Sequence, residues 1–526
     1  MLIDFRQLDN DIALDADICI IGAGAAGITL AWAFRDSPLK VILLESGGLT
    51  YDADIQSLCK GESVGRSYFP LDATRLRYFG GSTNHWGGWC APLQEMDFEP
   101  RSWVSYSGWP IRKQQLDPYY DTAQQLCQLG PYRYQLEDWT DEYRTFPPFH
   151  HDKVQICFWQ LGPPTRFGQQ YRDVLEQAKN VRVYLYANVA ELVTNEAASQ
   201  VQAALIRTLQ GKTGTVRARV FILACGGIEN ARLLLLSRRT ESHGLGNRDD
   251  LVGRFFMDHP HAIPAVILAT EPRTLVQLFT VFTRIDGSTR LLAGLSPSPA
   301  AQVNQKILNS SGTVDFKIGP PETGYDAYTQ VKQFLQQGEW PDDFAWRLWR
   351  MVSDLDDVFS GAWRPAGEPY VGNVTLVQLF TRSEQEPNPN SRITLSHERD
   401  SLGLPQARLD WRLTELDKRS VRIANRLLGE EFGRLGLGRL RLADWLLTDD
   451  SDWSSKMEGG NHHMGTTRMA DDPRQGVVDR NCQVHGIGNF YIAGSSVFPT
   501  SGYANPTLTL VALALRLADY VKQNYA

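Results

Sequence analysis

DICIIGAGAAGITLAWAFRDSPLKVILLESGG, residues 17–48, is the stretch of this chain that decides its fold. An apolar run at residues 18–21 is typical of a buried parallel strand, and it ends in three glycines before a helical stretch. Gly22 permits a tight turn, Gly24 leaves room for a pyrophosphate, and Gly27 lets the helix pack closely on the strand. This order of residues predicts a dinucleotide-binding site.

The residues that follow strengthen this interpretation. The start of the helix would direct its free N–H groups and positive dipole end at the phosphates. A second strand, residues 41–44, ends in Glu45, whose carboxylate could accept hydrogen bonds from a ribose 2′-OH and would repel the extra phosphate of NADP. A glycine-rich turn in any α/β protein is the alternative, but the strand, helix and acid in their expected places favour a binding site. This stretch alone does not separate FAD from NAD.

Composition places the chain among ordinary globular proteins. Its 526 residues are too many for one small core, so we expect two domains, or one domain with a large insert. The hydrophobic fraction is 42%, the charged fraction is 21% and the net charge is -7. An acidic balance gives no reason to expect nucleic acid or an anionic membrane as a partner, and the sequence does not set the oligomeric state.

The start of the chain and its cysteines suggest a compartment. Residues 1–15 have no basic start, long apolar core or small-residue cleavage site, so we do not expect a signal peptide. Seven cysteines are scattered without metal-binding spacing and are expected to be reduced thiols in a cytoplasmic protein. We expect no membrane span, because Arg516 interrupts even the apolar run near the C-terminus.

Residues 77–89, RYFGGSTNHWGGW, predict a loop whose backbone approaches another group closely. The part GGSTNHW resembles the flavin-facing loop of glucose-methanol-choline (GMC) oxidoreductases, and most closely that of the sugar-oxidising branch that includes pyranose oxidase and fructose dehydrogenase. The resemblance implies that Gly81, Ser82 and His85 contact FAD. It also makes His85 a candidate for a covalent bond to the flavin 8α-methyl carbon, although many members hold FAD without one. Trp86 replaces the family's common Asn, which favours the sugar-oxidising branch.

The middle of the chain adds a second strand, glycine and helix unit. Short alternating strands from residue 181 predict a β-meander that runs into the apolar strand 221–224 and the pair Gly226-Gly227. Two such units separated by a meander favour FAD, because a domain that binds only a nicotinamide dinucleotide would lack the meander. By resemblance, the backbone at Val189 contacts adenine.

Residues 262–434 read as a largely antiparallel sheet backed by helices. Its strands include residues 391–396 and 407–413, and one backing helix spans residues 343–359. The aromatic residues 130–167 suit either plain packing or a lid over a sugar-sized substrate, and both alternatives stay open. No metal site is expected, because three histidines without paired ligand spacing are better read as structural: His259, His261 and His397.

The C-terminal region contains the candidate chemistry. A strand at residues 490–493 ends at Gly494, where many family members have Asp. Asn505 as N-cap and Pro506 at the first helical position predict a helix that starts at Thr507. Its dipole, if directed at the flavin pyrimidine ring, would stabilise the negative charge of the reduced flavin.

Family resemblance assigns the chemical roles. Alcohol oxidation by a flavin needs a base for the hydroxyl proton. The family's catalytic histidine is separated from a Gly-Thr pair by two variable residues, and in HHMGT this histidine is His462. The family's second catalytic residue, His or Asn, falls on Asn505, which would orient the hydroxyl. Capping of the helix alone is the serious alternative for Asn505, because one amide oxygen cannot serve both helix and substrate equally.

Together these features predict an α/β protein with a Rossmann-type FAD-binding domain, an inserted β-meander and an α+β substrate domain. The expected FAD-binding parts are residues 12–110, 178–261 and 440–526, and the substrate-binding and lid parts are residues 111–177 and 262–439. The expected activity is FAD-dependent oxidation of a sugar, glycoside, aminocyclitol or related polyol, with an unidentified electron acceptor. The alternatives are an oxidase that reduces O₂ to hydrogen peroxide, a non-redox lyase of the same fold and a nicotinamide dehydrogenase.

Overall fold

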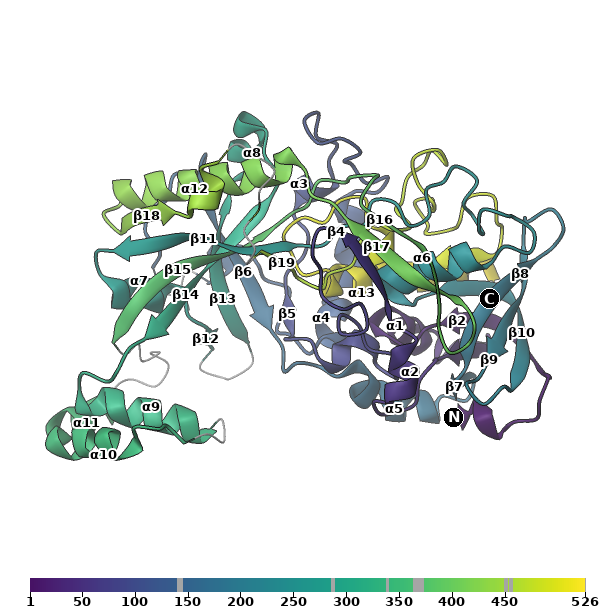
Figure 1. Cartoon of the computed structure of the whole chain (residues 1–526), viewed down its shortest axis with the longest axis horizontal. Coiled ribbons are helices and arrows are strands. Elements are labelled where there is room, and N and C mark those ends of the chain that lie inside the picture. The colour runs from purple at the N-terminus through teal and green to yellow at the C-terminus, as the bar shows by residue number, and fades with distance from the viewer. Residues whose placement is uncertain are drawn as a thin grey trace.

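Strand β2 (Ile12–Ile21) lies at the centre of an eight-stranded sheet in the computed structural model (Figure 1). From β1 to β10 the pairs are parallel, in the order β1 (Leu2–Asp4), β7 (Val181–Leu185), β3 (Val41–Leu44), β2 and β10 (Thr213–Leu223). β10 continues into an antiparallel meander with β9 (Val201–Arg207) and β8 (Asn188–Thr194), and β20 (Phe490–Ile492) pairs with its last residues. The structure describes residues 1–139, 145–284, 289–336, 340–362, 373–448, 453 and 457–525.

β2 begins six residues earlier than the sequence predicted. Its last four residues are buried, whereas its first part, residues 12–15, alternates between half-buried and exposed positions. That first part pairs with β10, from Ile12 opposite Gly214 onwards. Polar residues such as Asp15 are tolerated there because only one face of the strand is covered.

Helices near the glycine turns pack beside this sheet. α1 (Ala25–Phe34) contacts α13 (Thr507–Tyr525), so segments nearly 500 residues apart lie together, and α6 (Gly226–Leu236) follows β10. α4 (Asp117–Leu126) packs on α13, and α5 (Phe167–Gln177) packs on α1. The division of the chain into the predicted domain ranges, which assigned residues 111–177 to the substrate part, stays a prediction.

A second sheet is antiparallel, as predicted, and forms the other half of the molecule (Figure 1). Its order is β18 (Gly438–Leu442), β11 (Pro260–Ala269), β15 (Val374–Ser383), β14 (Ser310–Ile318), β13 (Arg290–Pro297), β6 (Val154–Leu161) and β5 (Trp89–Cys90). Short strands β12 (Phe282–Thr283) and β19 (Glu458–Gly459) pair with β13 and β11. α12 (Glu415–Arg434) and α7 (Pro272–Phe279) pack against it, which gives this half its own core.

Two predicted strands belong elsewhere. Residues 391–396 and 407–413 were expected in the antiparallel sheet, but β16 (Arg392–Arg399) and β17 (Pro405–Trp411) form a third sheet with β4 (Gly61–Gly65). β16 and β17 contact α6 instead. The prediction was wrong because alternation shows that a strand is half-buried but does not show which sheet it joins.

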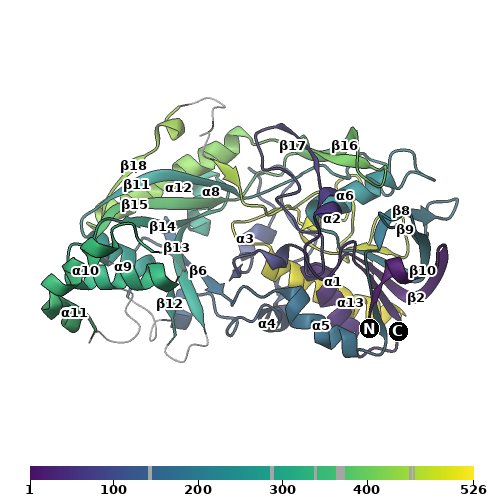
Figure 2. The ribbon, with the colours of Figure 1, turned by 60° about the horizontal axis from the view of Figure 1, so that its bottom comes forward.

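The helical stretch 343–359 also differs from its prediction. It forms α10 (Phe344–Ser353) and α11 (Leu355–Ala362), which pack with α9 (Gly324–Gln336) in an insert between β14 and β15. Figures 1 and 2 show this insert at the edge of the molecule instead of behind the sheet. Within the described residues, no helix is long and apolar enough to cross a membrane.

Candidate active site

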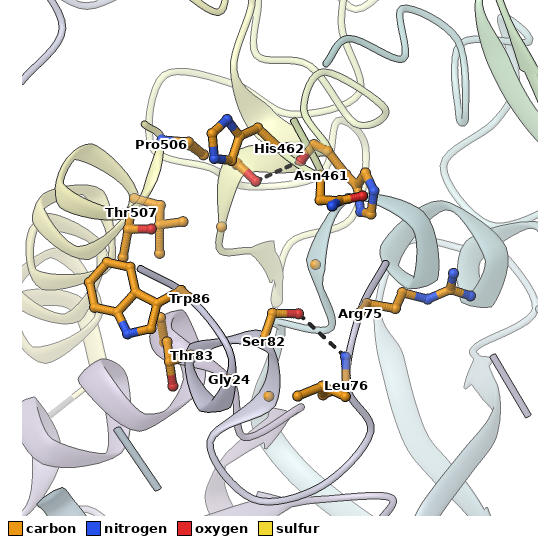
Figure 3. Close-up of a pocket in the computed structure, with 18 of the residues that line it drawn as sticks. Gly24, Arg75, Leu76, Ser82, Thr83, Trp86, Asn461, His462, Pro506 and Thr507 are labelled. Atoms are coloured by element: carbon orange, nitrogen blue, oxygen red, sulfur yellow. Dashed lines mark hydrogen bonds between the residues drawn. The ribbon is translucent and has the colours of Figure 1, made fainter. Parts of the chain in front are cut away.

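A cavity of about 520 Å³ opens where the carboxyl ends of the parallel strands face the second sheet. The turns after β2, β3, β10 and β20 contribute Gly22, Glu45, Gly226 and Gly494 to its wall. This is the edge of an α/β sheet at which ligands bind. Figure 3 shows Gly24 and Ser82 at one end of the cavity and His462 and Pro506 at the other.

The first glycine turn has the geometry that its sequence predicted. Gly22 has φ +102°, and a side chain there would lie 2.7 Å from the carbonyl of Ala224. A side chain at Gly27 would lie 1.8 Å from the carbonyl of Gly22, so only glycine lets α1 approach β2 this closely. At Gly24 a Cβ would meet nothing within 4 Å, which leaves open space beside the first free N–H groups of α1.

Glu45 is buried at the end of β3 and fixed by the backbone. Its Oε2 accepts a hydrogen bond from Ala23 N–H at 3.0 Å, and its Oε1 accepts one from Gly47 N–H at 2.9 Å. Burial raises the pKa of Glu45, while these two N–H groups and Arg77 oppose the rise. Oε1 also accepts a hydrogen bond from Ser46 Oγ at 3.2 Å, whereas Oε2 keeps a lone pair that can accept another hydrogen bond from the cavity.

The loop of residues 77–89 contacts this turn. Gly80 N–H donates to Ala23 O at 2.9 Å, and a Cβ on Gly81 would lie 3.0 Å from the Cα of Gly24. Ser82 Oγ accepts a hydrogen bond from Leu76 N–H at 3.4 Å (Figure 3), and His85 lines the cavity.

Residues 130–167 support this loop from behind. Arg166 donates to the carbonyls of Thr83 and Trp86, and Trp86 Nε1 donates to Thr165 O at 2.8 Å. No described residue of 130–167 lines the cavity, which favours the packing alternative over a lid.

Val189, whose backbone was predicted to contact adenine, lines a second, small cavity of about 50 Å³. This cavity shares Gly22, Arg77 and Glu229 with the main cavity, so the two cavities are adjacent. Beside Val189, both side-chain polar atoms of Asn188 are buried without a hydrogen-bond partner among the described residues. A buried amide in that state needs a polar ligand.

His462 and Asn505 meet at the other end of the main cavity, although 43 residues separate them. Asn505 Nδ2 lies 3.2 Å from His462 Nε2, and the backbone N–H of His462 donates to Asp258 Oδ1 at 2.8 Å. Asn505 Oδ1 is buried with no partner in the described structure, so the predicted side-chain cap is wrong. α13 instead begins at Thr507, with its first helical bond from Leu510 N–H to Pro506 O.

Hydrogen bonds fix the tautomer of His462. His259 Nε2 is 3.4 Å from the carbonyl of Ser501, which can only accept, so Nε2 carries the proton of His259. His259 Nδ1 is then an acceptor, 2.9 Å from His462 Nδ1, which must donate. The Nε2 of His462 is left unprotonated and receives the Asn505 amide N–H.

Burial keeps this cluster of histidines neutral. It lowers the pKa of His462 well below its ordinary value, and His259, His261 and Arg382 add to the effect. The pKa of His259 falls to about 4, also chiefly through burial. In the described part of the chain, no group of side chains has the arrangement of a metal site.

Sequence reasoning missed three residues of this site. His259 and His261 were read as structural, yet His259 bonds His462, and His261 lines the cavity with a buried Nε2 that has no partner among the described residues. Arg382 also lines the cavity. Arg382 is the one charged residue of strand β15, whose other residues are apolar or uncharged polar, and that charge was the signal present in the sequence.

Comparison with known families decides the identity. The family model described as GMC oxidoreductase matches residues 387–514, which include His462 and Asn505, and the model described as FAD dependent oxidoreductase matches residues 17–245. The chain is an FAD dependent oxidoreductase that carries the C-terminal domain of GMC oxidoreductases.

Relatives of this GMC oxidoreductase extend over nearly the whole chain. The fructose dehydrogenase large subunit of Gluconobacter japonicus is 24% identical, over 97% of this chain and 98% of the relative. The 6'''-hydroxyparomomycin C oxidase of Streptomyces lividus is 25% identical, over 97% and 92%. Among solved structures, formate oxidase has a TM-score of 0.54 at 16% identity, over 98% and 99% of the two chains, which shows a shared fold.

FAD is therefore the cofactor of this GMC oxidoreductase, which argues against the alternative of a nicotinamide dehydrogenase. The residues present suit it. The space beside Gly24 can admit a diphosphate, and the unpartnered amide of Asn188 lines the smaller cavity, which is adjacent to the main one.

Proposed function

We propose that this GMC oxidoreductase oxidises a CH–OH group of a sugar, glycoside, aminocyclitol or related polyol to a carbonyl, with His462 as the base. The observation that carries the proposal is the pairing of His462 Nε2 with Asn505 Nδ2 at 3.2 Å in the wall of the cavity. The names of the relatives, which are sugar and aminoglycoside oxidases and dehydrogenases, support the substrate class.

The tautomer of His462 suits proton removal. Its Nδ1–H is held by His259, so the lone pair of Nε2 is directed to Asn505 and the cavity. A substrate hydroxyl that replaces this direct 3.2 Å contact could donate its proton to Nε2 and accept a hydrogen bond from the amide. Because the pKa of His462 is lowered, the imidazole is neutral and able to accept that proton at physiological pH.

Asn505 would orient the hydroxyl. Its buried Oδ1 is free of any partner among the described residues, so the amide is not engaged in capping α13. Two polar contacts on one hydroxyl fix the direction of the adjacent C–H bond, which is the positional requirement for hydride transfer. Bound FAD supplies the hydride acceptor, its N5 atom.

The proposed FAD contacts follow the cavity walls. Gly22, Gly24 and Gly27 form the turn for the diphosphate, and Glu45 accepts from a ribose hydroxyl. The remaining proposed contacts are Gly81, Ser82, His85, Val189, Gly494 and Thr507. The start of α13 at Thr507 would place its positive dipole end in the cavity.

Replacing His462 by Ala tests the proposal. The variant should bind FAD but lose at least about 100-fold in the rate of flavin reduction by an alcohol, the lower limit expected for a general base. The measurement is anaerobic loss of the yellow absorbance in a stopped-flow instrument. His397→Ala, a change on the exposed end of β16, is the matched control and should leave the rate unchanged. Normal reduction by the His462→Ala protein would refute the role.

Two further assays complete the assignment. The relatives include both oxidases and dehydrogenases, so hydrogen peroxide formation during turnover in air distinguishes O₂ from another acceptor. Covalent attachment at His85 stays a prediction that its place in the cavity wall supports. A yellow pellet after acid precipitation, lost in His85→Ala, is the expected result of such a bond.

We also infer a cytoplasmic location. In the structure all seven cysteines are free thiols; six of them are buried, and Cys225 is half-buried. Reduced thiols are typical of that compartment.

A further inference from the structure

Arg382 brings a positive charge to the substrate end of the cavity. It lies in β15 directly opposite His261 of β11, and both residues line the cavity. Side chains of directly opposed residues in an antiparallel pair lie on the same face, about 5 Å apart at Cβ. The ring of His261 is in turn 6.1 Å from that of His462. Arg382 is therefore a near neighbour of the proposed base.

The charge of Arg382 is not balanced by the protein. Its guanidinium forms no ion pair or hydrogen bond with any described residue, and Nη1 is buried without a partner. The other two arginines of the cavity wall differ, because Arg75 and Arg77 are both bound to Glu229, at 2.8 and 2.9 Å. Glu384, two residues along the strand, is bound by Arg101.

Aromatic rings hold the guanidinium in place without neutralising it. Its carbon lies 4.5 Å from the ring centroid of Trp89 and 5.1 Å from that of Phe380. Such cation–π contacts fix the position of an arginine and leave its N–H groups available. Burial lowers the pKa of Arg382 to about 10, so the group is still a cation at neutral pH.

We propose that Arg382 binds an anionic group of the substrate, a carboxylate or a phosphate, so that the alcohol oxidised by this enzyme is negatively charged. An unpaired, largely desolvated cation is costly, and a ligand anion would remove that cost. The planar fork of a guanidinium fits two oxygens of either group. The inference rests on the proposed function and narrows its substrate class.

The positions of the side chains limit the size of the substrate. The hydroxyl must reach His462 while the anion reaches Arg382, and His261 is near both, opposite Arg382 in the sheet and 6.1 Å from the ring of His462. The two groups of the substrate are therefore separated by a few bonds, as in a hydroxy acid, a sugar acid or a sugar phosphate.

Binding to the holoenzyme gives a test that does not depend on turnover. Acetate, inorganic phosphate, glucuronate and glucose 6-phosphate are titrated against the flavin absorbance of the wild type and of Arg382→Met, with glucose as the neutral comparison. Arg382→Met should weaken binding of the preferred anion roughly 100-fold and change glucose binding less than about threefold, because only the charged hydrogen bonds are lost. Arg382→Lys should recover part of the loss, since it keeps the charge without the fork.

A matched control removes the same charge from the same sheet. Arg441 is exposed on β18, outside the cavity wall, and Arg441→Met should leave all affinities unchanged. Comparing the carboxylates with the phosphates shows which anion the site prefers. FAD content is measured in every variant, because a role of Arg382 in holding FAD would reduce it.

Several outcomes would overturn the inference. One is that Arg382→Met weakens the binding of neutral and anionic ligands equally. Another is that Arg382→Met loses FAD. A third is that the wild type binds no anion more tightly than Arg382→Met does. Oxidation of glucose but of no anionic alcohol would reject the inference while the proposed function stands. If no alcohol reduces the flavin and anions still require Arg382, the proposed function fails and the anion site remains.

Discussion

His462 shows how the chemistry of one residue depends on a neighbour. Its two ring nitrogens have different partners, His259 at Nδ1 and Asn505 at Nε2, and these partners decide which nitrogen can accept a proton. His259 obtains its own orientation from the carbonyl of Ser501. A base whose tautomer is fixed in advance always presents its unprotonated nitrogen to the substrate. In serine hydrolases a carboxylate fixes the tautomer of the catalytic histidine in the same way.

Replacing His259 by Leu should therefore lower the rate of flavin reduction by about 10- to 100-fold with little change in KM, because the tautomer of His462 is no longer fixed. His259→Asn, whose amide oxygen can accept the Nδ1–H, should recover most of the rate. A purely structural role for His259 would instead change FAD content or thermal stability in both variants.

The pH dependence provides the second readout of the same prediction. The wild-type rate should be constant above pH 6.5 and fall only in more acid solution, because the pKa of His462 lies well below its ordinary value and the neutral form is the base. Burial is the main cause of the low pKa of His462, and the charge that His259 gains in acid, with a pKa of about 4, lowers it further. The acid limb should therefore move to higher pH in His259→Leu. An acid limb that moves to lower pH in His259→Leu would contradict the proposed effect of His259 on the pKa of His462.

At the scale of secondary structure, the turn between β2 and α1 contains one glycine needed for cofactor binding and another needed for folding. Gly24 faces open space, whereas Gly27 is in contact with the carbonyl of Gly22. The two glycines belong to one sequence motif, yet a methyl group would have different consequences at each.

Gly24→Ala should leave the thermal stability of the FAD-free protein unchanged and weaken FAD binding, because the new methyl group occupies only space meant for the diphosphate. Gly27→Ala should destabilise the FAD-free protein by about 3 kcal/mol, since its Cβ would overlap the backbone of Gly22. Calorimetry of the FAD-free proteins and FAD titration check both. Equal loss of stability in the two variants would show that the space at Gly24 is not free.

On the scale of the whole molecule, the active site lies where two sheets face each other. The parallel sheet contributes its glycine turns, and the antiparallel sheet contributes His261 and Arg382. The helical insert α9–α11 takes no part in this arrangement, because none of its described residues lines the cavity. It exposes large apolar side chains such as Trp340, Trp349 and Phe359.

Removing the insert should leave FAD binding and the rate of flavin reduction within about twofold of the wild type. Ile318 pairs with Val374, and Gly319 N–H donates to Asn373 O at 2.7 Å, so a short turn can replace residues 320–372 without moving β14 or β15. FAD absorbance and anaerobic reduction compare the shortened and full-length chains. A loss of FAD would show that the insert supports the site.

The sequence by itself determined the parts of this protein that depend on local order. The glycine turn, Glu45, the meander and the C-terminal motif lie within short stretches, and their spacing predicted an FAD-binding α/β protein with an antiparallel second sheet. Family resemblance then pointed to His462 and Asn505, and the structure brings this pair together.

Tertiary structure alone decided what depends on long-range packing. Strand pairing placed β16 and β17 beside β4, because alternation does not specify a partner strand. It also brought His259 against His462 and left Arg382 beside His261 without a counter-ion among the described residues. Whether a buried charge or imidazole is paired depends on residues far away in the chain, and its chemistry follows from those neighbours.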